Sequence, residues 1–222
     1  MYQHPGYYGS PGYYGRPTPR PPGGYGRGRS GGLLAGAFGG VALVLLLLGA
    51  MWILEILDQF LFFGRLDHYG IVGGDPEGLV GVPLAPFLHA GFGHLMANSL
   101  PLLVLGIMAA IRGVGRFIAA TMIIVLVSGV GVWVVTPPYV VTVGASGLVF
   151  GYFGYVVARG LFDRHSLDIA LGIVVVVLYS SLLWGVLPGD PGVSWQGHLF
   201  GLVGGVLAAW LLRRRRFARG DY

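Results

Sequence analysis

Two residues of this chain, Ser146 and His198, carry side chains that could together perform nucleophilic chemistry. Ser146 stands in Gly144-Ala145-Ser146-Gly147 at the start of an apolar, glycine-rich run, and His198 opens a second such run. A serine hydroxyl becomes a nucleophile when a neighbouring base takes its proton, and histidine is the usual base. Both runs are apolar enough to lie in a bilayer, where a polar side chain is costly and commonly functional. The pattern predicts a Ser146–His198 catalytic dyad inside a membrane.

The composition indicates the class of protein that would carry such a site. Of the 222 residues, 55% are hydrophobic and 10% are charged, and the mean hydropathy is +0.72. Because a soluble domain has about one-quarter charged residues, we predict an all-α, multi-pass protein of the cell membrane. The net charge of +5 comes from arginines, which lie beside apolar runs and favour a topology signal over nucleic-acid binding. The chain has no cysteine, which excludes disulfides and thiolate chemistry.

A bilayer-spanning helix needs about 20 apolar residues, and the chain offers six candidate runs. Pro137-Pro138 divides one long uncharged stretch into the third and fourth of them. Between the first two spans, residues 55–88 carry charges, Gly and Pro, which predicts an ordered loop lying on the membrane. The six spans are predicted at 33–54, 94–111, 117–135, 144–158, 169–187 and 196–212.

Two tails flank this membrane domain of residues 33–212. Residues 1–32 are rich in Tyr, Gly and Pro, which predicts a disordered tail that either stays solvated or docks a partner. Residues 213–222 form a short basic tail. If both tails are cytoplasmic, Arg65 is the only arginine outside, in agreement with the excess of positive charge on cytoplasmic segments. This pattern predicts an even number of spans with both termini in the cytoplasm.

Three short motifs lie on the second, fourth and sixth predicted spans: His94-Leu95-Met96-Ala97-Asn98, Gly144-Ala145-Ser146-Gly147, and His198-Leu199-Phe200-Gly201 with Gly205. Together they resemble the rhomboid family of intramembrane serine proteases. Each motif is short, but the three in this order on alternate spans form a specific pattern, and the resemblance covers residues 33–212. It implies a six-helix rhomboid-like bundle of the bacterial type, transmembrane protein substrates, and no cofactor or metal.

The resemblance also implies a role for each residue. Ser146 would be the nucleophile and His198 the base, while His94, Asn98 and the Ser146 amide would stabilise the oxyanion. His94 and Asn98 are four residues apart and share one helix face. Simpler roles exist for the same residues: Ser146 could be a helix N-cap, and the other two could form interhelical hydrogen bonds.

Small and aromatic residues next to the motifs are expected to support the site. Glycines on the fourth and sixth spans would let the two backbones approach closely, either for catalysis or as generic helix packing. Phe150, one turn after Ser146, could stack on the His198 ring, at a position where the family often has tyrosine. His89 matches another family histidine and is expected to be structural. The supporting set is Gly144, Gly147, Phe150, Gly201 and Gly205.

The sequence departs from the family in the first loop, where many bacterial members carry a Trp-Arg pair and this chain has Leu79-Val80-Gly81-Val82-Pro83. The predicted function is an intramembrane serine endopeptidase with an outward cavity capped by residues 137–143 and 188–195. One alternative is a non-catalytic rhomboid-like binder or quality-control factor for membrane proteins. A channel or transporter relaying protons through His94 and His198 is disfavoured, because no predicted span carries a central carboxylate.

Overall fold

The computed structural model of the chain describes residues 1–2, 29–189 and 192–213. Most of the two predicted tails, residues 1–32 and 213–222, therefore lies outside the described part of the chain. Within that part, six long helices correspond one to one with the six predicted spans. They are α1 (Arg29–Leu57), α3 (Phe92–Ala110), α4 (Val114–Val135), α5 (Ser146–Asp163), α6 (Ser166–Tyr179) and α7 (Trp195–Leu211).

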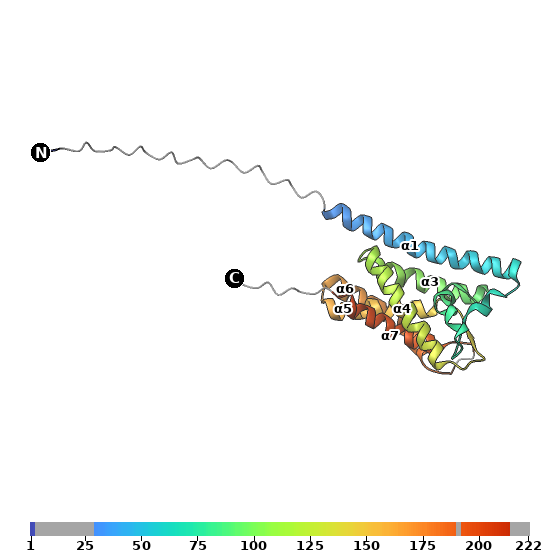
Figure 1. The fold of residues 1–222 in the computed structure, drawn as a ribbon. Coiled ribbons are helices and arrows are strands. Elements are labelled where there is room, and N and C mark those ends of the chain that lie inside the picture. The colour runs from blue at the N-terminus through green and yellow to red at the C-terminus, as the bar shows by residue number, and fades with distance from the viewer. Residues whose placement is uncertain (3–28, 190–191, 214–222) are drawn as a thin grey trace.

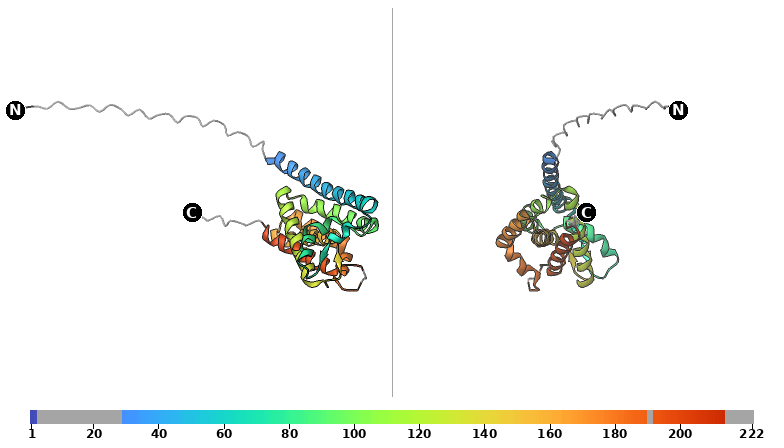
Figure 2. Two further views of the ribbon diagram at one scale, coloured as in Figure 1. Left: turned by 45° about the vertical axis from the view of Figure 1, so that its right-hand side comes forward. Right: turned by 90° about the vertical axis from the view of Figure 1, so that its left-hand side faces the viewer.

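The helices form a bundle with α5 and α7 at its centre (Figures 1 and 2). These two helices pack against each other along their length, α4 packs on both, and α1 lies at the edge against α3. The described start of α1 and the end of α7 lie at the same end of the bundle, as an even number of crossings requires (Figure 1). The N-terminal ends of α3, α5 and α7 consequently gather at the opposite end.

Among the described residues, four helical segments are long and apolar enough to cross a membrane: Phe38–Phe62, Phe92–Ala110, Val114–Val135 and Ser166–Val186. The other two helices are less suited, since α7 has 17 residues and α5 includes Arg159 and Asp163. The position of α5 accounts for its charges, because a helix enclosed by other helices does not have to present an apolar surface to lipid. Helix α7 is short, but it keeps an exposed apolar face that includes Val203, Val206 and Trp210. The predicted all-α membrane bundle is confirmed, and the six helices are consistent with six spans.

Helices α1 and α5 continue further than the hydropathy pattern predicts. A π-helical turn, η1 (Asp58–Phe62), extends α1, so that Glu55 and Asp58 belong to the helix end and are buried. A 3-10 helix, η5 (Ser180–Val186), continues α6 and ends within the predicted span 169–187. At α5, the predicted end at residue 158 falls five residues short of the observed end at Asp163.

The segment between η1 and α3 is ordered and consists of short elements. These are η2 (Leu66–Tyr69), β1 (Ile71–Val72), η3 (Glu77–Val80), α2 (Gly81–Leu84) and η4 (Ala85–Phe87). Strand β1 pairs antiparallel with β2 (Val141–Thr142), with Ile71 opposite Thr142. The sequence analysis did not predict this strand pair, which joins the first loop to the segment just before α5.

This loop is anchored by hydrogen bonds to Trp133 of α4 and to the segment just before α5. The indole N–H of Trp133 donates to the carbonyl oxygen of Asp75 at 2.7 Å, and the Gly74 N–H donates to the carbonyl of Trp133 at 2.8 Å. A third bond runs from the Gly144 N–H to the carbonyl of Ala85, also at 2.8 Å. A tryptophan of α4 thus anchors a loop that lacks the Trp-Arg pair common in the resembling family.

At the other end of the bundle, a buried carboxylate pairs with two arginines. Asp168, at the start of α6, accepts hydrogen bonds from the Arg112 guanidinium, and its Oδ1 lies 2.9 Å from Nε of Arg159. Arg159 also donates to the carbonyls of Met108 and Ala109 in the last turn of α3. Removing one partner of such a buried pair costs about 3–5 kcal/mol, so this cluster fixes α3, α5 and α6 relative to one another.

Glycines set the spacing of α5 and α7. A Cβ atom on Gly201 would overlap the carbonyl oxygen of Gly147, and one on Gly205 would overlap the carbonyl of Gly151. The two backbones therefore touch at successive turns, which a side chain at either position would prevent. The close helix contact predicted from these glycines is present.

We expect Gly205→Ala to lower the stability of the folded protein by about 1–3 kcal/mol, because the added methyl group overpacks the α5–α7 contact. Gly49→Ala is the matched control, since a Cβ at Gly49 in α1 meets no atom within 4 Å. In the control, alanine's better helix propensity acts alone and is expected to leave stability unchanged or raised. Thermal unfolding in detergent measures both variants, and equal stability of the two would contradict the close contact.

Candidate active site

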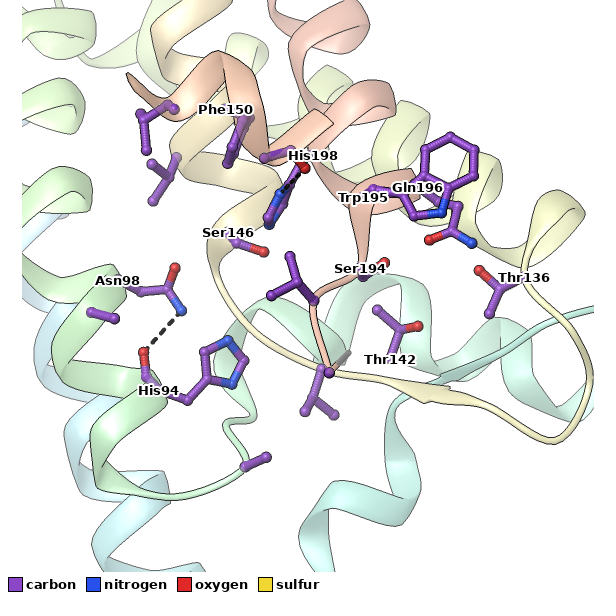
Figure 3. Close-up of a pocket in the computed structure, with 18 of the residues that line it drawn as sticks. His94, Asn98, Thr136, Thr142, Ser146, Phe150, Ser194, Trp195, Gln196 and His198 are labelled. Carbon is purple, nitrogen blue, oxygen red and sulfur yellow. Dashed lines mark hydrogen bonds between the residues drawn. The ribbon is translucent and has the colours of Figure 1, made fainter. Parts of the chain in front are cut away.

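A cavity of about 620 Å³ lies at the end of the bundle where α3, α5 and α7 begin (Figure 3). Two loops border it, at residues 136–143 and 192–196. These are parts of the two loops that the sequence analysis expected to cap an outward cavity. Five of the predicted site residues, drawn from three separate helices, line this one cavity: His94, Asn98, Ser146, Phe150 and His198.

Ser146 is the first residue of α5, and its side chain lines the cavity (Figure 3). The N-cap is Ala145, and no side chain caps the helix, so the alternative of Ser146 as a simple N-cap does not describe this structure. The first N–H groups of a helix have no intrahelical acceptor and carry the positive end of the helix dipole. The hydroxyl of Ser146 thus lies next to free main-chain donors.

Gly144 shapes the turn that leads into α5. Its φ of +118° lies in a region that favours glycine. A Cβ at this position would also lie 2.6 Å from Cε1 of His94. Any larger residue would therefore strain the backbone and displace the imidazole of His94 from the cavity wall.

His198 lies in the first turn of α7 and is held from three directions. Its ring stacks on Phe150, with the ring centroids 4.0 Å apart and the planes inclined by 9°, in the arrangement predicted for this pair. The main-chain N–H of His198 donates to the carbonyl of Ser194 at 3.2 Å, and the side chain of Ser194 caps α7 by accepting a hydrogen bond from the Gly197 N–H. The third contact joins Nδ1 of His198 to the carbonyl oxygen of Gly185 at 2.8 Å.

That third contact determines which ring nitrogen carries the proton. A carbonyl oxygen can only accept a hydrogen bond, so Nδ1 of His198 must be the donor to Gly185. In the neutral imidazole, Nε2 is then unprotonated and can act as a base. Figure 3 shows Ser146 and His198 at the same wall of the cavity, on the two central helices.

His94 and Asn98 face the cavity from α3 (Figure 3). The Asn98 amide donates one hydrogen bond to the main-chain carbonyl of His94 at 3.1 Å, a bond within α3 rather than between helices. An amide group has two N–H donors, so the second is available to another acceptor. Both side chains therefore lie on the side of the cavity that faces the start of α5, and Asn98 brings a spare N–H donor there.

His89 supports the site from the loop before α3. Its Nε2 accepts a hydrogen bond from the N–H of Ala145 at 3.3 Å, and its ring meets that of His94 edge-on. Burial, with a smaller contribution from His94, lowers the pKa of His89 to about 4. His89 is therefore neutral near pH 7 and keeps the lone pair that holds the residue preceding Ser146.

Three residues of the site were missed by the sequence analysis: Ser128, Gly185 and Ser194. Ser128 of α4 donates its hydroxyl to the carbonyl of Gly197 at 3.1 Å, next to His198. A serine in an otherwise apolar span is a recognisable signal, and so is Ser194 just before an apolar helix. Gly185 contributes only a backbone carbonyl, for which no side-chain pattern exists.

The groups around the cavity suit acyl transfer: a hydroxyl, an unprotonated imidazole nitrogen, free helix amides and a side-chain amide. Among the described residues, no group of three or more His, Asp or Glu side chains is arranged to hold a metal ion. The cavity thus gathers, from three helices, the kinds of group that acyl transfer uses.

Comparison with known proteins agrees with this geometry. Residues 76–215 match the family model of the rhomboid domain. An uncharacterized protein of Mycobacterium tuberculosis is 44% identical over 177 residues, covering 76% of this chain and 73% of the relative. One of Mycobacterium leprae is 40% identical over 182 residues, covering 78% and 71%. Rhomboid protease GluP of Bacillus subtilis is 29% identical over 124 residues, covering 55% of this chain and 24% of GluP. The chain is therefore a multi-pass membrane protein that belongs to the rhomboid family.

Proposed function

We propose that the chain is an intramembrane serine endopeptidase that cleaves transmembrane segments of other membrane proteins with a Ser146–His198 dyad. The observation that supports this most directly is the hydrogen bond from Nδ1 of His198 to the Gly185 carbonyl. It leaves Nε2 as the basic nitrogen of a ring that lines the same cavity as Ser146. Membership of the rhomboid family and the likeness to rhomboid protease GluP support the same activity.

The reaction has two halves. In the first, Oγ of Ser146 attacks the scissile carbonyl carbon while Nε2 of His198 takes the hydroxyl proton. The C–N bond of the tetrahedral intermediate then breaks, and Nε2 returns the proton to the leaving amine. In the second half, Nε2 of His198 takes a proton from a water molecule, whose oxygen attacks the carbonyl carbon of the acyl-enzyme ester. The C–O bond to Ser146 then breaks, and Nε2 gives the proton to Oγ of Ser146. The stacked face of Phe150 stabilises the imidazolium that forms in each half.

The oxyanion is held by the Ser146 amide, His94 and Asn98. The amide belongs to the first turn of α5, where the helix dipole favours negative charge. His94 and Asn98 lie across the cavity on α3, and the second amide N–H of Asn98 supplies a further donor. Donors that are fixed before the reaction, in a site of low dielectric constant, stabilise a developing charge more strongly than water does.

Hydrolysis inside a membrane also needs water and room for a peptide. The cavity of about 620 Å³ is large enough for several water molecules and is partly lined by polar groups. The loops at 136–143 and 192–196 border it, so a substrate helix that unwinds beside them can place its peptide bond at Ser146.

The proposed topology places both termini in the cytoplasm and the cavity end outside. Arg112, Arg159 and Arg164 lie at the bundle end where α1 begins and α7 ends, in agreement with the excess of positive charge on cytoplasmic segments. Reporter fusions after Arg116 and Arg164 are expected to report the cytoplasm, and fusions at Pro76 and Pro188 the outside. A cytoplasmic signal from the Pro76 fusion would contradict this orientation.

Cleavage of a model transmembrane substrate by the purified protein in liposomes tests the activity. Ser146→Ala and His198→Ala are each expected to abolish cleavage, and the double variant to be no worse, because the two residues act as one unit. Asn98→Ala removes one oxyanion donor and is expected to retain activity at roughly a hundredth to a thousandth of the wild-type rate. Fragments are identified by mass spectrometry.

Two results would contradict the proposal in different ways. Cleavage by Ser146→Ala at the wild-type rate would remove this serine from the reaction. Binding of transmembrane segments without cleavage by the wild-type protein, across a panel of substrates, would favour the alternative of a non-catalytic membrane-protein binder. Both Ser146 and His198 are present in the chain, which supports the protease over the binder.

A further inference from the structure

The acceptor for His198 comes from a helix that carries none of the residues proposed for catalysis. Gly185 lies in η5, the 3-10 continuation of α6, whereas Ser146 and His198 lie on α5 and α7. None of the described residues lining the cavity is an aspartate or glutamate. The position that an aspartate occupies in a serine–histidine–aspartate triad, at Nδ1 of the histidine, is taken here by a backbone carbonyl.

The local sequence explains why this carbonyl is free. In a helix, a carbonyl accepts from the N–H three or four residues later. The residue three positions after Gly185 is Pro188, which has no N–H. The chain also turns to an extended backbone at Leu187, whose N–H bonds to Trp184 instead. The carbonyl of Gly185 is thus an unpaired helix-end acceptor until His198 donates to it.

The packing around residue 185 also requires a glycine at this position. A Cβ there would lie 2.9 Å from Cζ of Phe150 and 3.0 Å from Nδ1 of His198. Both atoms belong to the stacked ring pair, which is packed and cannot easily move aside. Glycine therefore lets the η5 backbone come close enough for the 2.8 Å hydrogen bond.

The segment that supplies this acceptor is itself weakly embedded. Only 11% of the most apolar stretch within Ser166–Val186 is buried in the bundle, and no residue of η5 is buried. The side chain of Trp184, adjacent to Gly185, is 76% exposed. A shift of η5 away from α7 would therefore uncover little buried surface beyond the partly buried Leu182, but it would break the bond to His198.

We propose that the Gly185 carbonyl is the positioning group that holds His198 in the tautomer required by Ser146, so that the docking of η5 on α7 controls the competence of the base. This inference rests on the proposed function of Ser146 and His198. When η5 is docked, Nδ1 carries the proton and Nε2 is basic. When η5 is displaced, the ring is free to rotate and to exchange tautomers. In a serine–histidine–aspartate enzyme, the wrong tautomer lowers kcat by about 10⁴.

The test compares Gly185→Ala with Gly172→Ala. In α6, a Cβ on Gly172 meets Val157 at an ordinary 3.6 Å, so this control adds a methyl group without displacing a neighbour. Gly185→Ala is expected to lower kcat about a hundredfold with little change in KM, because misplacing a catalytic group by about 1 Å costs that much. Gly172→Ala is expected to keep the wild-type kcat. A second variant, Pro188→Ala, restores an N–H that can compete for the Gly185 carbonyl and is expected to lower kcat less.

A readout that does not need activity is the ¹⁵N spectrum of histidine-labelled protein, with the His198 signals assigned from the His198→Ala spectrum. We expect a single tautomer protonated at Nδ1 in the wild type and in Ser146→Ala, and a mixture in Gly185→Ala. A folded Gly185→Ala protein with the wild-type kcat and an unchanged tautomer would overturn the inference. If Gly185→Ala does not fold, wild-type kcat and an unchanged tautomer in Pro188→Ala would overturn it instead. A wild-type protein that shows the Nδ1 tautomer but cleaves no substrate would overturn the proposed function while leaving the hydrogen bond in place.

Discussion

The close approach of α5 and α7 is the constraint on which the rest of the site depends. Helix axes normally lie about 8–10 Å apart, and a short side chain such as serine reaches a neighbouring helix most easily where the two backbones come closer than that. Here the carbonyls of Gly147 and Gly151 occupy the space that side chains at Gly201 and Gly205 would fill. Since apolar helices gain no hydrophobic energy by associating in lipid, such tight packing is also what holds the two helices together.

Around this contact, three polar side chains of the site pair with main-chain groups inside an apolar bundle. His198 donates to Gly185, Ser128 donates to Gly197, and His89 accepts from Ala145. Each bond avoids the cost of several kcal/mol for an unpaired polar group out of contact with water, and each also orients a group of the site. The Arg112–Asp168–Arg159 cluster does the same at the far end of the bundle, where it fixes three helices on which the cavity is built.

Much of the fold follows from the sequence because apolar runs, arginines and the Pro137-Pro138 break determine where helices lie. The features of the fold that the sequence did not predict depend on contacts between residues that are distant in sequence. Glu55 and Asp58 carry charges typical of a loop, yet the folded loop buries them at the end of a helix. Arg159 closes a predicted span but is buried inside the bundle because Asp168 pairs with it. Two-residue strands such as β1 and β2 are too short to show any alternation of apolar and polar residues.

In the candidate site too, some groups could be predicted from the sequence and others only from the fold. Ser146 and His198 stand out because reactive side chains are rare in apolar helices, whereas the acceptor of His198 is a main-chain atom that only the fold reveals. The measurement that tests the central claim most directly is covalent labelling with a fluorophosphonate, with the modified peptide located by mass spectrometry. We expect the label on Ser146 in the wild-type protein, and much slower labelling of Ser146 in the His198→Ala variant. A label on another residue, or labelling of Ser146 at the same rate without His198, would contradict the dyad.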